Sequence, residues 1–156
     1  MKKTLLLIVT HSLFAAAGFA AGIYFLPILT APEPPPMAEV ERLAGQARFT
    51  GEFRRDLAGS DALHWGEGTV SVSDDAVSLL GKIAPGPDYR LYLAPDFAED
   101  ETSFEAIKAE SVEVGEVKVF ENFIVEVPVG VDIAAYNTVV VWCESFGEFI
   151  SAARYR

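Results

Sequence analysis

Cysteine is almost absent from this sequence. Cys143 is the only one in 156 residues, so no disulfide can form within the chain. A zinc knuckle, a cysteine-ligated iron–sulfur cluster and a C-x-x-C-H haem attachment each need more than one cysteine, so a single chain cannot build them. A lone cysteine outside the cytoplasm is a free thiol, an intermolecular link, a ligand or a buried packing residue, and these alternatives stay open.

Positive charge is also scarce. The chain has 12 Lys and Arg against 23 Asp and Glu, a net charge of −11. Lys2, Lys3 and Glu33 are the only charged residues before Met37, so the remainder carries 10 basic and 22 acidic residues, a net −12. Such a surface repels phosphate backbones, and nucleic-acid binding is therefore not expected. It would attract a basic redox partner or a cationic ligand, or simply keep the domain soluble.

No charged residue occurs between Thr4 and Leu29. As a helix rising about 1.5 Å per residue, this segment exceeds the roughly 30 Å of hydrocarbon in a bilayer. Ala20-Ala21 resembles a signal cleavage site, but the apolar run continues past it, beyond the 7–15 or so residues of a signal peptide's apolar region. Residues 1–30 are therefore predicted to be an uncleaved signal anchor, a single transmembrane helix, with a cleaved signal peptide as the alternative.

The two lysines before the apolar segment predict its orientation. Because positive residues stay on the cytoplasmic side, Lys2 and Lys3 place the C-terminal domain outside. The expected location is a bacterial-type inner membrane, with the domain in the periplasm. Residues 31–45 begin with Ala-Pro-Glu-Pro-Pro-Pro, which favours an extended proline-rich linker with a short helical turn after it. Residues 46–156 are predicted to form the domain.

Within the domain, apolar residues alternate with polar ones at a period of two, which is typical of strands. The run Thr138–Cys143 is rich in β-branched residues and suits a strand covered on both faces. The region 97–116 has no clear pattern beyond helical turns at 104–110. The predicted class is all-β, an antiparallel β-sandwich or Greek-key barrel. Its strands are expected at 49–53, 89–93, 123–127, 138–143 and 149–155, with a hairpin at 68–80.

Several positions together form a combination typical of one family. The domain opens with Phe49-x-Gly51-x-Phe53, and Gly86-Pro87-Asp88-x-x-Leu91-x-Leu93 follows. Its most specific part closes the chain, Tyr136-x-x-Val139-Val140-x-Trp142-Cys143-x-x-Phe146-x-x-Phe149-x-x-Ala152. Over Arg48–Arg156 the sequence resembles the DM-thirteen family of extracellular and periplasmic domains.

This resemblance implies an electron-transfer or redox role. The family's signature cysteine matches Cys143, which would act as a bare thiol, the candidate catalytic group, or bind a prosthetic group such as haem. His64, the only histidine after the anchor, is a candidate haem ligand, proton donor or thiolate partner. Trp142 is a candidate for the wall of a cofactor pocket. The cofactor is unknown, no metal site is predicted, and whether the chain is an enzyme stays open.

The strand pattern around Cys143 supports a plainer alternative. Alternation places Cys143 on the face shared with Val139 and Val141, with Trp142 on the other face, and a thiol among apolar groups reacts poorly. Two hypotheses therefore remain. The first is a membrane-tethered redox domain centred on Cys143, with an envelope redox partner. The second is a non-catalytic envelope binding module with a structural cysteine. No oligomeric state follows from the sequence.

Overall fold

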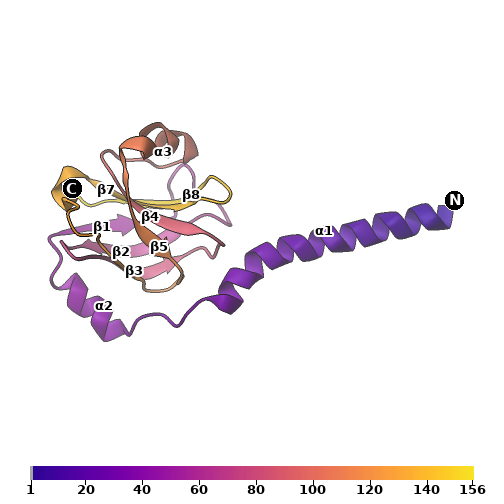
Figure 1. Ribbon diagram of the computed structural model, residues 1–156, viewed down its shortest axis with the longest axis horizontal. Coiled ribbons are helices and arrows are strands. Elements are labelled where there is room, and N and C mark those ends of the chain that lie inside the picture. The colour runs from indigo at the N-terminus through magenta and orange to yellow at the C-terminus, as the bar shows by residue number, and fades with distance from the viewer. Residues whose placement is uncertain (1) are drawn as a thin grey trace.

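The computed structural model describes residues 2–156, which form a long helix followed by a β-rich domain (Figure 1). The domain's strands form two antiparallel four-stranded sheets, in the orders β1-β2-β3-β6 and β5-β4-β7-β8. The predicted all-β sandwich is confirmed. The strands are β1 (Phe49–Phe53), β2 (Gly66–Val72), β3 (Ala76–Ile83), β4 (Tyr89–Ala94), β5 (Val112–Val117), β6 (Ile124–Glu126), β7 (Thr138–Cys143) and β8 (Glu148–Arg154).

The helix α1 (Lys2–Thr30) is long and apolar enough to cross a membrane, by its length and composition. None of its 29 residues is buried, and most of the helix extends away from the domain (Figure 1). Pro27 lies inside it, and a helical proline removes one hydrogen bond and bends the axis. The C-terminal part of α1 bends and ends beside the domain (Figure 1).

The segment after α1 stays close to the domain. Residues 31–36 have no regular structure, and Pro32 and Pro34 line a groove that Trp65 also lines. The short helix α2 (Met37–Ala44) follows and packs against β2 and β3 through the fully buried Val40. The proline-rich segment is therefore laid along the domain.

The predicted hairpin at 68–80 is confirmed as β2 and β3. Its turn is closed by Ser73, whose backbone N–H donates to the carbonyl oxygen of Ala76 at 2.9 Å and whose hydroxyl oxygen accepts from the Ala76 N–H at 3.0 Å. The bond to the Ser73 side chain is a second hydrogen bond across the turn, and it stabilises the turn although no glycine is present there.

The central strand β7 lies between β4 and β8, and all six of its residues are buried. One face of β7 contributes to the core between the two sheets. The other face is covered by the helix α3 (Glu101–Ile107), through a second apolar cluster that includes Phe104 and Trp142. The prediction of a strand covered on both faces is confirmed.

The region without a clear sequence pattern contains α3, a 3-10 helix at Lys108–Glu110 and then β5. Asp100 caps α3, since its carboxylate accepts from the Ser103 N–H at 2.8 Å. The pairing of β5 with β4 shifts register between Leu91 and Tyr92. This bulge interrupts the alternation of β5, which is why the sequence did not reveal the strand.

Candidate functional site

Cys143 is the last residue of β7, where the strand meets the turn into β8. Its Cα partners are Tyr89 on β4 and Glu148 on β8. The residue is 3% exposed and belongs to the core between the sheets, with Val139 and Val141. The face predicted for Cys143 is therefore confirmed, and its sulfur lies at the end of the sandwich.

The turn after β7 surrounds this sulfur with backbone N–H groups. Gly147 closes the turn, because its N–H donates to the Cys143 carbonyl oxygen at 2.9 Å. The φ of Gly147 is +66°, a conformation that costs most other residues about 1–2 kcal/mol. In this turn the backbone N–H groups of Ser145 and Phe146 act on the sulfur and lower the pKa of Cys143.

The segment Gly86-Pro87-Asp88 supplies the other side of the enclosure. The backbone N–H of Asp88 also lowers the pKa of Cys143. The Asp88 carbonyl oxygen accepts from the Glu144 N–H at 3.0 Å, and its carboxylate accepts from the Ser145 hydroxyl at 2.7 Å. The two motifs that stand far apart in the sequence therefore meet at Cys143.

Burial and hydrogen bonding act in opposite directions on the Cys143 thiol. Burial raises the pKa of Cys143, because an apolar surrounding disfavours the thiolate. The N–H groups of Phe146, Asp88 and Ser145 lower the pKa, and the Asp88 carboxylate raises it. On balance the pKa of Cys143 is raised, so the resting group is a thiol. If the thiol loses its proton, these three N–H groups are there to stabilise the thiolate.

His64 lies in the loop before β2 and is held by Asp61. Its Nδ1 is 3.2 Å from Oδ2 of Asp61, and its backbone N–H donates to Oδ1 at 2.7 Å. The pKa of Asp61 is lowered, first by the Leu63 backbone N–H and further by His64. The His64 side chain is 25% exposed. With Nδ1 beside Asp61, Nε2 is the ring nitrogen left to exchange a proton.

The structure brings Cys143 and His64 to the same pocket, which has a volume of about 300 Å³. Tyr89 and Glu148 also line it, and Leu63 and Phe146 lie at its exposed rim. A further wall comes from α1, through Ala20, Ile23 and Tyr24. Most of the lining is apolar, and the few polar groups in it come from different elements, which is the usual composition of a small-molecule site.

Tyr89 also belongs to the site, although the sequence pattern predicts for it only a place on a strand. It is 4% exposed, and its pKa is raised by burial and by the neighbouring Cys143. A Cβ on Gly86 would lie 2.3 Å from the Tyr89 hydroxyl oxygen, so a glycine is required there. The sequence Gly-Pro-Asp-Tyr could have drawn attention to Tyr89. That Tyr89 lies opposite Cys143, however, follows only from the pairing of β4 with β7.

Trp142 lies on the opposite face of β7 and lines a different space. Its ring centroid is 5.1 Å from that of Phe104, and Nζ of Lys108 is 5.2 Å from the Trp142 ring. Within the described chain its buried Nε1 has no hydrogen-bond partner. The structure therefore separates Trp142 from Cys143 and His64.

The family model described as Electron transfer DM13 matches residues 53–155, which include Cys143, His64 and Tyr89. The chain belongs to the DM13 family. The resemblance inferred from the sequence is thereby confirmed, and the family description suggests an electron-transfer role. A comparison with curated proteins found no match, and neither did a comparison with solved structures.

The structure gives no support for haem in the pocket of this DM13 domain. The pocket volume of about 300 Å³ is at the lower end of the range for ligand sites. Cys143, whose sulfur would bond the iron, is only 3% exposed. In residues 2–156 no group of three or more His, Cys, Asp and Glu side chains could hold a metal ion.

Proposed function

We propose that this protein is a membrane-tethered electron-transfer domain on the extracytoplasmic side, with Cys143 as its reactive group. One observation carries the proposal: Cys143 and His64, far apart in the sequence but both within the region that matches an electron-transfer family, line one pocket. The pocket gives a small oxidant or reductant access to a sulfur that is otherwise buried.

The residues around the sulfur can move a proton and hold the resulting charge. The Sγ proton passes to His64, whose ring Asp61 orients through Nδ1. The thiolate that remains accepts hydrogen bonds from Phe146, Asp88 and Ser145. Thiolate is the form of cysteine that acts as a nucleophile and electron donor, so this proton transfer is the activating step.

The tethering part of the proposal rests on α1. Its length and apolar composition suit a membrane span, and Lys2 and Lys3 at its start favour an external domain. The location proposed is the periplasmic face of a bacterial-type inner membrane. Carbonate extraction and protease protection of cells expressing the full chain test it: the domain should remain with the membrane and be cut only from the outside.

Thiol chemistry in the full-length protein tests the role of Cys143. The protein in detergent micelles is alkylated with N-ethylmaleimide, and the rate is compared with that of His64→Gln. Loss of the proton acceptor should slow alkylation about 100-fold at neutral pH, at the lower end of the usual range for a general base. Equal rates for the two proteins would refute the proposed pairing, and a thiol that reacts only after unfolding would refute a reactive Cys143.

The burial of Cys143 favours a second candidate, a non-catalytic binding module in which the thiol only packs. A buried thiol with a raised pKa is typical of a structural cysteine. A Cys143→Ser strain separates the candidates, provided that the variant protein is folded and present at normal abundance. Full function supports the binding module, and a null phenotype supports the redox domain.

A further inference from the structure

The pocket that holds Cys143 lies at the level where α1 would leave the membrane. The hydrocarbon region accommodates about 20 helical residues, and a span that starts at Thr4 ends at Ile23. Ala20, Ile23 and Tyr24 are the residues of α1 that line the pocket, so this wall reaches from the last turn of the span to its end. Tyrosine is enriched at this boundary between hydrocarbon and headgroups. One wall of the pocket therefore coincides with the outer boundary of the bilayer.

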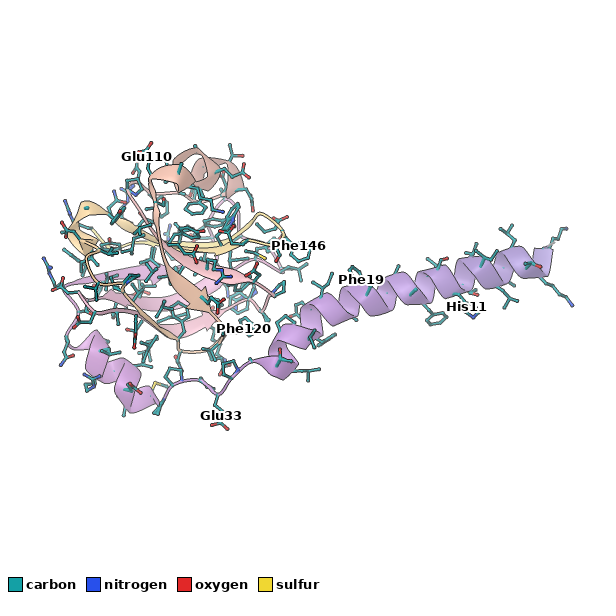
Figure 2. All side chains as sticks on the ribbon, viewed as in Figure 1. His11, Phe19, Glu33, Glu110, Phe120 and Phe146 are labelled. Carbon is teal, nitrogen blue, oxygen red and sulfur yellow. The ribbon has the colours of Figure 1, made fainter. Side chains whose placement is uncertain are left out.

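The side of the domain nearest α1 presents apolar side chains. Leu63 is 55% exposed and Phe146 is 54% exposed, and both lie at the rim of the pocket. Figure 2 shows Phe146 and Phe120 on the side of the domain closest to the end of α1. Phe146 also lines an adjoining groove along α1 with Gly22 and Leu26. An apolar path therefore runs from the pocket along the helix.

The interior of the pocket has a different composition from its mouth. His64, Tyr89 and Cys143 come from three separate elements and provide an imidazole, a phenol and a thiol around one space. A phenol O–H can donate a hydrogen bond to a carbonyl oxygen, and so can Nε2 of an imidazole once it has taken up a proton. The volume of about 300 Å³ suits a single substituted ring.

We infer that this pocket binds the ring of a membrane-soluble quinone, whose apolar tail leaves along α1 into the bilayer. The quinone oxygens provide the acceptors that His64 and Tyr89 can satisfy, and the tail follows the groove beside Phe146. The inference concerns binding. It rests on the proposed function, because it requires that α1 spans the membrane. It also names the chemical class of the redox partner.

The test uses the full chain in detergent micelles and decylubiquinone, a fully substituted benzoquinone with an alkyl tail. Binding to the folded state should raise Tm saturably, by about 3 °C or more at a hundredfold excess over Kd. Decanol has a tail without a quinone ring, and duroquinone has a ring without a long tail. Both should give a much smaller shift at the same concentration.

Variants connect the shift to the pocket. Ile23→Trp fills the mouth from α1 and should abolish most of the ligand-induced shift. The matched control is Leu29→Trp, on an exposed residue of the same helix that lines none of the described pockets, and it should retain the shift. Leu63→Trp narrows the same pocket from the domain side and should also abolish most of the shift. Because Leu63 is not in α1, this result does not depend on whether Ile23→Trp inserts normally into the membrane.

Three results would overturn the inference: no saturable shift with decylubiquinone, an equal shift with decanol, or an equal loss in both tryptophan variants of α1. The second would mean that the pocket takes acyl chains. Alkylation of Cys143 in the same samples keeps the two proposals apart. A reactive Cys143 without quinone binding rejects this inference alone, and quinone binding beside an inert Cys143 rejects the proposed role of the thiol alone.

Discussion

Tyr89 lies directly opposite Cys143 in the antiparallel pair formed by β4 and β7, and Gly86 lies close against the Tyr89 ring. The relationship explains why a glycine, a tyrosine and a cysteine from distant parts of the chain belong to one site. The glycine leaves room for the ring, and the ring and the thiol line one pocket at the end of the core.

Gly86→Ala should destabilise the domain and change the environment of Cys143. The new Cβ would lie 2.3 Å from the Tyr89 hydroxyl oxygen, so the ring must move. Overpacking of this kind costs about 1–3 kcal/mol, which urea unfolding of the full chain can measure. Gly45→Ala is the matched control, because its Cβ would meet atoms only at 3.5 Å. Equal effects of the two substitutions would contradict the role given to Gly86.

Gly147→Ala should affect both stability and the thiol. The φ of +66° is strained for alanine, at about 1–2 kcal/mol, and relaxing it would move the Ser145 and Phe146 N–H groups from the sulfur. The pKa of Cys143, measured from the pH dependence of alkylation, should therefore rise further. Gly130→Ala is strained in the same way at φ +94°, but it is remote from the pocket. It should cost similar stability and leave the alkylation profile unchanged.

The raised pKa of Cys143 predicts a pH-dependent stability. A thiol that titrates at higher pH in the folded state than in the unfolded state stabilises the fold below the unfolded pKa, about 8.5. That contribution is lost as pH rises toward the folded pKa. Wild type should therefore lose stability relative to Cys143→Ser between about pH 8 and pH 10. A constant difference across this window would show that the fold does not shift the pKa.

Substitutions at Trp142 should separate the two faces of β7. Trp142→Ala removes a buried indole and should cost about 3–5 kcal/mol. Trp142→Phe should cost less, because it also removes a buried Nε1 that has no partner in the described chain. Neither change touches the pocket, so the alkylation rate of Cys143 in the folded protein should stay within about twofold of wild type. A larger change in the alkylation rate after Trp142→Phe would show that packing on one face of β7 affects the thiol on the other.

Local pattern predicted much of the fold. Period-two alternation located β7 and assigned Cys143 and Trp142 to opposite faces, because the direction of a side chain on a strand depends only on its neighbours. The strand β5 escaped prediction because its bulge breaks that alternation. His64 was a candidate partner of the thiol only because it is the one histidine after the anchor. That it lines the same pocket as Cys143 depends on how the loop before β2 lies against the other sheet, which local pattern does not determine.

The short segment between α1 and α2 limits how far the domain can move from the membrane. Six residues extend to about 20 Å at most, and here they lie along the domain. Under the proposed tethering, the pocket stays close to the membrane surface. A partner that is itself held in the membrane would meet the pocket by lateral diffusion within the membrane plane. The rate of these encounters would then follow the surface density of that partner, and dilution of the surrounding medium would leave it unchanged.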